Sequence, residues 1–176
     1  DIAGKVVGLI GAGEIGSLVA KKLINGFDCS VIYYDVHPNE TLNALGATYM
    51  SQEEVLERAD IVSLHVPLLP ATTHLINEKT LALMKPSAFL INTSRGPVVD
   101  EAVLTKALVE KKIAGAALDV FEFEPTISRT LRHLENVILT PHIASARVSV
   151  RESMGDKVAE NIIAFTEGGA LKNLAQ

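Results

Sequence analysis

The chain has 176 residues and a formal net charge of −5, with 48% hydrophobic and 21% charged residues. This length fits one domain with a single core, and a chain without a Lys/Arg-rich block is not typical of a nucleic-acid binder. Cys29 is the only cysteine, which excludes an internal disulfide and a cysteine zinc cluster, so we expect a protein of the reducing cytoplasm and no metal site. No apolar segment approaches the roughly 20 residues that span a bilayer, so we expect no membrane partner.

A short apolar run and a glycine turn open the chain. The run Val6–Ile10 is followed by Gly11, Gly13 and Gly16, in the pattern G-x-G-x-x-G. Glycines at this spacing permit a tight turn, a close approach of the backbone to a pyrophosphate and close packing of the next helix on the strand. The next apolar run ends in Asp35, 19 positions after Gly16, where a carboxylate would bind a ribose hydroxyl. These features indicate dinucleotide binding, and a glycine turn in a phosphate-free α/β protein is the alternative.

Helical and strand patterns alternate along the rest of the chain. Helices are predicted at 14–25, 40–45, 52–58, 78–84, 100–112 and 149–166, and strands at 31–35, 47–50, 60–66, 88–92, 113–120 and 137–139. In the helix at 14–25, the apolar residues at helical spacing are Ile15, Leu18, Val19, Leu23 and Ile24. Ser51, followed by acidic residues, is the expected N-cap of the helix at 52–58. In the helix at 100–112, the residues expected to face inward are Ala102, Val103, Leu104, Ala107 and Leu108. The alternation predicts an α/β fold with a doubly wound parallel sheet, three layers and helices on both faces. In such folds the ligand lies beyond the carboxyl ends of the strands, where the strand order reverses.

Functional side chains follow three of the later predicted strands. Arg95 comes after the strand at 88–92, Glu122 and Glu124 come after the strand that contains Asp119, and His142 comes after the last one. Hydride transfer to a ketone beside a nicotinamide needs groups of these types. An arginine binds a carboxylate with two parallel hydrogen bonds and polarises the neighbouring carbonyl, while a histidine exchanges the alcohol proton near neutral pH. A carboxylate beside such an imidazole fixes the tautomer and stabilises the protonated ring.

Five motifs together resemble the nucleotide-binding domain of the D-isomer-specific 2-hydroxyacid dehydrogenases. They are the glycine motif at 11–16, His65-Val66-Pro67, and the segments at 91–101, 115–125 and 136–142. The resemblance implies a Rossmann domain over residues 1–176, with Arg95 as the catalytic arginine, Glu124 as the catalytic glutamate and His142 as the acid/base histidine. It also implies NAD as the cofactor and a small 2-hydroxy or 2-oxo acid as the substrate.

The cofactor-binding residues are expected along the same edge of the sheet. The full set is Gly11, Gly13, Glu14, Ile15, Gly16, Asp35, Val66, Pro67, Thr72, Thr93, Ser94, Arg95, Asp119, His142 and Ala144. By the resemblance, the backbone of Glu14 and Ile15 contacts the pyrophosphate, and Asp119 lies near the nicotinamide carboxamide. Asp35 favours NAD, because its carboxylate would repel a 2′-phosphate and no Arg or Lys follows within five residues.

Other polar residues receive a plainer interpretation. Glu122 would point away from Glu124 in an extended segment, so we expect it to be solvated. We expect structural roles for the remaining histidines, His37, His65, His74 and His133, with His65 near the cofactor. The sequence departs from the family pattern after His142, where Ile143–Arg147 replaces a glycine-containing turn, so Ala144 would narrow the nicotinamide pocket.

The organisation of the whole protein is a separate expectation. The first strand begins almost at once and no methionine opens the chain, so we interpret the sequence as a piece of a larger protein. In the family, the chain segments before and after this domain together form a substrate-binding domain, and the enzyme is a homodimer. Two alternatives stay open. One is an NAD-sensing binding module like the related transcriptional corepressors, and the other is an isolated domain that binds NAD without turnover.

Overall fold

The computed structural model describes residues 1–171, so residues 172–176 of the predicted domain lie outside the described residues. The chain forms two compact units, Asp1–Pro141 and His142–Gln176. The first unit contains the whole sheet, and the described part of the second contains one long helix, α6 (Val148–Thr166). No helix among the described residues is both long and apolar enough to cross a bilayer.

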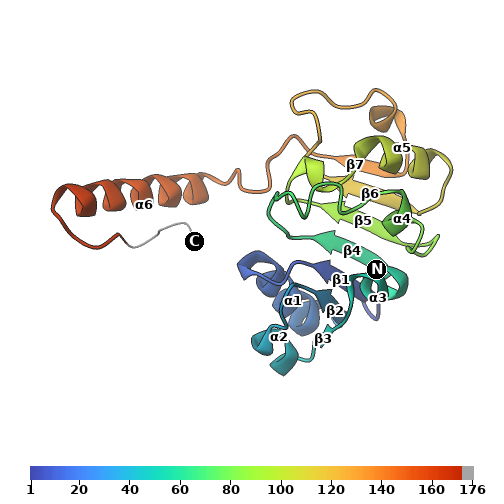
Figure 1. Cartoon of the computed structure of the whole chain (residues 1–176), viewed down its shortest axis with the longest axis horizontal. Coiled ribbons are helices and arrows are strands. Elements are labelled where there is room, and N and C mark those ends of the chain that lie inside the picture. Colours follow the sequence, from blue (N-terminus) through green and yellow to red (C-terminus); the bar gives the residue numbers. More distant parts are fainter. Residues whose placement is uncertain (172–176) are drawn as a thin grey trace. The chain divides into compact units, whose positions relative to one another are not determined.

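The first unit is built on a seven-stranded sheet in which every pairing is parallel (Figure 1). The strand order is β3-β2-β1-β4-β5-β6-β7. The strands are β1 (Val6–Ile10), β2 (Ser30–Tyr34), β3 (Thr48–Tyr49), β4 (Ile61–Leu64), β5 (Phe89–Asn92), β6 (Gly115–Leu118) and β7 (Val137–Leu139). The predicted alternation is confirmed, although β3, β4 and β6 are shorter than their apolar runs because the ends of those runs enter loops.

Helices follow the strands in the predicted order. They are α1 (Glu14–Phe27), α2 (Glu40–Ala44), α3 (Gln52–Arg58), α4 (Glu78–Leu81) and α5 (Glu101–Val109), with short 3₁₀ turns η1 (Gly96–Val98) and η2 (Leu131–His133). However, α4 and α5 each end three residues before their predicted ends. The side chains of Ser51 and Glu54 form a capping box that begins α3. α1 runs two residues past its predicted end and stops at Asp28, which adopts a left-handed conformation.

Strand order reverses between β1 and β4. The chain moves from β1 to β2 and β3 in one direction, then returns to pair β4 with the other side of β1. Right-handed crossovers therefore place α1 and α2 on one face of the sheet and α3, α4 and α5 on the other. Two buried clusters match these faces, one including Leu9 and Tyr33 and the other including Ile10 and Leu64. The reversal creates the crevice where doubly wound folds bind their ligands.

The packing of α1 differs from the simple helical pattern. Its buried residues are Gly16 and Ala20, whereas Ile15 and Leu18 are 66% and 58% exposed. A Cβ on Gly16 would overlap the carbonyl oxygen of Gly11, so the helix packs through its small residues. The larger neighbours consequently turn outward. Ala102 of α5 is also exposed, which corrects its expected inward position.

The helices of the first unit leave part of one sheet face uncovered. Phe89 and Ile138, on the α1 side of β5 and β7, are 49% and 69% exposed within the described chain. On the opposite side, Leu90 and Leu118 are buried. The main core of this unit therefore lies beneath α3, α4 and α5.

Candidate functional site

The glycine turn lies at the carboxyl end of β1, at the point of strand reversal. Gly11 has a φ of 101°, and a Cβ there would come within 2.7 Å of the backbone carbonyl carbon of His65, so the turn requires glycine. Gly13 is different: among the described residues, no heavy atom lies within 4 Å of a Cβ built on it. Gly16 packs on the carbonyl of Gly11, as described above. Gly11 and Gly16 thus perform the turn and packing tasks inferred from their spacing, while the approach of a pyrophosphate to Gly13 stays a prediction.

The start of α1 provides an anion-binding end next to this open space. Gly13 is the N-cap residue, and no side chain among the described residues caps the helix. The first N–H groups of any α-helix lack intrahelical acceptors, and the positive end of the helix dipole lies there. The backbone N–H groups of this helix start are donors that could hold a pyrophosphate, and its binding at Gly13, Glu14 and Ile15 stays a prediction.

Asp35 supports the turn from the end of β2. Its Oδ2 accepts a hydrogen bond from the Ala12 N–H at 2.6 Å, and its Oδ1 accepts one from the Val36 N–H at 2.7 Å. A carboxylate offers about four acceptor positions, so capacity remains for the hydroxyls of a ribose. The structure thus places the Asp35 carboxylate directly beside the glycine turn, and its role in binding a ribose stays a prediction.

Asn39 and Ser17 belong to this arrangement but were not predicted as site residues. The Asn39 Nδ2 donates to the Ala12 carbonyl at 2.8 Å and to the Ser17 Oγ at 3.1 Å, while its Oδ1 caps α2. Tyr33, fully buried, accepts from the Asn39 N–H at 2.7 Å. Asn39 has the residue type and place of a helix N-cap, which was the available signal. Its contact with the turn depends on tertiary packing.

The end of β4 forms the opposite wall of the turn. The His65 N–H donates to the Ile10 carbonyl at 2.7 Å, and the His65 Nε2 lies 3.0 Å from the Ser63 Oγ. Burial lowers the pKa of His65, so the ring is neutral near pH 7. These contacts are consistent with the structural role expected for His65. Val66 and Pro67 follow it, half-buried and exposed respectively.

Thr72 shapes the loop after Pro67. Its Oγ1 donates to the Pro67 carbonyl at 2.6 Å and accepts from the Leu69 N–H at 2.8 Å. The hydroxyl therefore bonds to the backbone of its own loop in this structure. A role of Thr72 in binding the cofactor remains a prediction.

Arg95 lies in the loop after β5, which a buried asparagine organises. The Asn92 Oδ1 accepts from the Ser94 N–H at 3.0 Å and from the Ser94 Oγ at 2.9 Å, and the Asn92 Nδ2 donates to the Arg95 carbonyl at 3.0 Å. Thr93 and Arg95 are exposed, whereas Ser94 is buried. The Arg95 guanidinium donates to the Ser94 carbonyl at 2.7 Å. The loop is thus fixed from below while its cationic side chain reaches solvent.

The loop after β6 carries Asp119 and Glu124. Asp119 is 4% exposed and its Oδ1 accepts from the Thr140 Oγ1 at 2.6 Å, which links the ends of β6 and β7. Glu124 is exposed, and its Oε1 accepts from the Phe121 N–H at 2.9 Å. A Cβ on Gly96 would overlap the carbonyl of Phe121. The loops of Arg95 and Glu124 are therefore in direct backbone contact.

The expectation that Glu122 is solvated is wrong. Its side chain is 14% exposed, with Oε1 at 2.6 Å from the His74 Nε2 and Oε2 accepting from the Glu101 N–H at 3.0 Å. The alternation of an extended strand does not apply, because the segment turns at this point. The structural role expected of His74 is consistent with this contact between its ring and the Glu122 carboxyl group.

His142 and Ala144 begin the second unit, directly after Thr140 and Pro141. His142 adopts a positive φ of 52°. The structure thus brings the loops of Arg95 and Glu124 together within the first unit, while the pairing of His142 with Glu124 stays a prediction. Arg147, to which the sequence assigned no role, is the N-cap residue of α6.

Comparisons with known proteins agree with this geometry. The model of the family described as D-isomer specific 2-hydroxyacid dehydrogenase, NAD binding domain, matches residues 1–144. A glyoxylate reductase from Thermococcus litoralis is 49% identical over 98% of this chain and 52% of its own length. The holo form of D-mandelate dehydrogenase from Rhodotorula graminis is 39% identical with a TM-score of 0.95, over 99% of this chain and 52% of that one.

A structure with bound NAD is also similar. The D-isomer specific 2-hydroxyacid dehydrogenase from Lactobacillus delbrueckii ssp. bulgaricus, in its NAD-complexed form, is 37% identical with a TM-score of 0.89, over 98% of this chain and 56% of that one. The chain therefore spans about half the length of the relatives it matches.

Proposed function

This chain belongs to the D-isomer specific 2-hydroxyacid dehydrogenases as their NAD binding domain, and we propose that it serves an NAD-dependent oxidoreductase acting on a 2-hydroxy or 2-oxo acid. One observation carries the proposal: the glycine turn lies at the strand reversal, and the loops of Arg95 and Glu124 follow strands of the same sheet. Parallel strands present their carboxyl ends at one edge, so these loops and the turn share that edge.

The residues along this edge would hold the cofactor. The open space at Gly13 and the start of α1 receive the pyrophosphate, and Asp35 accepts from a ribose hydroxyl. The remaining positions assigned to the cofactor are Val66 and Pro67 on the adenine side, Thr93, Ser94, Asp119, His142 and Ala144 on the nicotinamide side, and Thr72 and Arg95. We expect NAD rather than NADP, because the fixed charge of Asp35 repels a 2′-phosphate.

The side chains of this chain bind the acid and move its proton. When bound, NAD(H) supplies or accepts the hydride at its nicotinamide ring. Arg95 binds the substrate carboxylate and polarises the adjacent carbonyl. His142 donates a proton to the carbonyl oxygen during reduction and removes it during oxidation, while Glu124 orients the imidazole and stabilises its protonated form.

The proposed enzyme needs more than this domain. The relatives are about twice as long, and we assign the remainder to a substrate-binding domain that contributes to acid recognition and excludes water. We expect a homodimer in the cytoplasm, in keeping with the resemblance and with a single, buried cysteine. Burial raises the pKa of the Cys29 thiol, with a smaller effect of Asp28, so Cys29 acts as a small apolar residue.

Two assays test the proposal. The chain itself should bind NADH, measured by fluorescence titration, with weaker binding of NADPH. The two-domain enzyme that carries this chain should oxidise NADH with one or more of glyoxylate, pyruvate and phenylglyoxylate. These are the 2-oxo acids that correspond to the relatives' names: glyoxylate reductase, D-lactate dehydrogenase and D-mandelate dehydrogenase.

A matched pair of arginine variants localises the activity. Arg95→Gln should lower kcat/KM about 100-fold, because it removes the positive charge and the paired donors that polarise the carbonyl. Arg58→Gln is the control, since Arg58 is exposed on α3 and pairs only with Glu54 among the described residues, at 3.8 Å. Tight NADH binding without turnover of any 2-oxo acid would contradict the oxidoreductase proposal and favour an NAD-sensing module. Absence of NADH binding would contradict both.

A further inference from the structure

A buried glutamate of α5, Glu101, contacts Glu122, a mostly buried glutamate of the loop that carries Glu124. The Glu101 Oε2 accepts from the Glu122 N–H at 3.0 Å, and the Glu122 Oε2 accepts from the Glu101 N–H at 3.0 Å. Each glutamate thus accepts a hydrogen bond from the backbone N–H of the other, and these two hydrogen bonds join the first residue of α5 to the loop after β6. Glu101 is 6% exposed, and its Oε1 lies 3.4 Å from the Ser128 N–H. The roles assigned above do not use either glutamate.

The Glu101–Glu122 pair fixes the part of the backbone on which Glu124 depends. The Glu124 Oε1 accepts from the Phe121 N–H, and Phe121 immediately precedes Glu122. Displacing the backbone at Glu122 would therefore move the donor that orients the Glu124 side chain. Carboxyl groups shielded from solvent are unfavourable unless they accept hydrogen bonds. Glu101 and Glu122 each need the hydrogen bond from the other, so the loop is held against α5.

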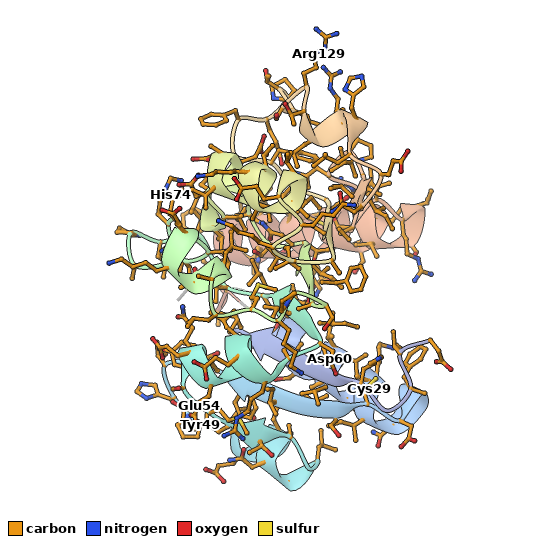
Figure 2. All side chains as sticks on the ribbon, turned by 90° about the vertical axis from the view of Figure 1, so that its right-hand side faces the viewer. Cys29, Tyr49, Glu54, Asp60, His74 and Arg129 are labelled. Carbon is orange, nitrogen blue, oxygen red and sulfur yellow. The ribbon has the colours of Figure 1, made fainter. Side chains whose placement is uncertain are left out.

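His74 extends the pair to the loop that carries Arg95. Its ring Nε2 lies 2.6 Å from the Glu122 Oε1, and its backbone N–H donates to the Pro97 carbonyl at 2.8 Å. Asp100, the N-cap of α5, lies on the other side of the ring, with its Oδ2 at 3.9 Å from the His74 Nδ1. Figure 2 labels His74 among the side chains of the first unit. One set of contacts thus reaches the backbone of both functional loops.

We propose that Glu101, Glu122 and His74 are positioning residues, which set the orientation of Glu124 relative to Arg95 without touching the substrate. The inference rests on the proposed function, because it acts through Glu124. The joined elements come from distant parts of the sequence, with His74 and Glu122 48 positions apart and Glu101 and Glu122 21 positions apart. The contacts that hold the Glu124 loop therefore depend on the tertiary fold.

The test uses the two-domain enzyme with Glu101→Gln and Glu122→Gln. Each variant removes one carboxylate oxygen from the reciprocal contacts while nearly preserving side-chain volume. We expect kcat to fall about tenfold with the KM for NADH within about twofold, since small displacements of catalytic groups reduce the chemical step by up to about 100-fold. Glu110→Gln is the control: Glu110 is exposed at the other end of α5, paired with Lys112 at 3.0 Å, and its substitution should leave kcat unchanged.

A double-mutant cycle with Glu124→Gln separates positioning from general structural support. If Glu101 acts through Glu124, Glu101→Gln should lower kcat by less than about twofold in the Glu124→Gln background. A full tenfold loss there, or an unchanged kcat in both single variants, would overturn the inference. If Glu124→Gln itself leaves kcat unchanged, the proposed role of Glu124 fails and the inference fails with it. His74→Gln provides a third single variant for the same cycle if Glu101→Gln lowers the fraction of folded enzyme.

Discussion

Replacing Gly13 with alanine should weaken NADH binding while leaving the fold intact. Among the described residues no heavy atom lies within 4 Å of the new methyl group, and the backbone angles of −70° and −161° suit alanine. As an N-cap residue, alanine is less favourable than glycine by less than about 1 kcal/mol. It also stabilises the protein by about 0.4–1 kcal/mol, because it reduces the conformational entropy of the unfolded chain. The free energy of unfolding should therefore change by less than about 1 kcal/mol. The methyl group projects into the space assigned to the pyrophosphate, so we expect at least a tenfold rise in Kd, or about 1.4 kcal/mol.

Gly16→Ala provides the matched contrast, because its methyl group would overlap the carbonyl oxygen of Gly11. We expect this variant to lose about 1–3 kcal/mol of stability through overpacking. Urea unfolding of the chain gives the stabilities, and NADH fluorescence titration gives the Kd values. A Gly13→Ala variant with the parent's Kd and stability would refute the placement of the pyrophosphate. A Gly13→Ala variant as unstable as Gly16→Ala would refute the distinction drawn between the two glycines.

Further substitutions test charge and capping. Asp35→Asn keeps one acceptor for the Ala12 N–H but removes the negative charge that would repel a 2′-phosphate. The ratio of the Kd for NADPH to the Kd for NADH should therefore fall at least about tenfold in titrations. An unchanged ratio would show that Asp35 does not select NAD. Hydrogen bonds from the Lys85 ammonium and, to a smaller extent, from the Val6 N–H lower the pKa of Asp60. The ionised Asp60 therefore stabilises the fold fully above the unfolded-state pKa of about 3.9, and this stabilisation is lost as the pH falls through the lower pKa of the folded state. Asp60→Asn should therefore cost about 1 kcal/mol at pH 7 in urea unfolding and much less near pH 2, whereas a pH-independent difference would contradict the ion pair. Ser51→Ala should cost about 1 kcal/mol by removing half of the capping box, and equal stability to the parent would argue that α3 does not need it.

The sequence predicts those features that local patterns control. Strand alternation, the α3 cap and the glycine turn each depend on neighbouring residues, and the structure confirms them. The distance along the chain also predicted an acidic residue at the end of β2, where Asp35 lies, and its role in binding a ribose stays a prediction.

Features that depend on tertiary contacts were missed. Ile15 faces solvent because Gly16 packs against a turn five residues earlier, which a helical pattern does not reveal. Glu122 is mostly shielded from solvent because it contacts His74 and Glu101, which come from distant segments. Asn39 was recognisable by type as a helix cap, but its hydrogen bond to Ala12 spans 27 positions and appears only in the folded chain.

The tyrosines provide an optical consequence of this architecture. The chain has three tyrosines and no tryptophan, and all three tyrosines lie on β2 and β3. Tyr33 and Tyr49 have ring centroids 5.5 Å apart, and the Tyr33 hydroxyl bonds to Asn39, which contacts the glycine turn. The near-ultraviolet circular dichroism of the unmodified protein therefore reports on one flank of the sheet, and a nucleotide arriving there can be followed without any attached dye.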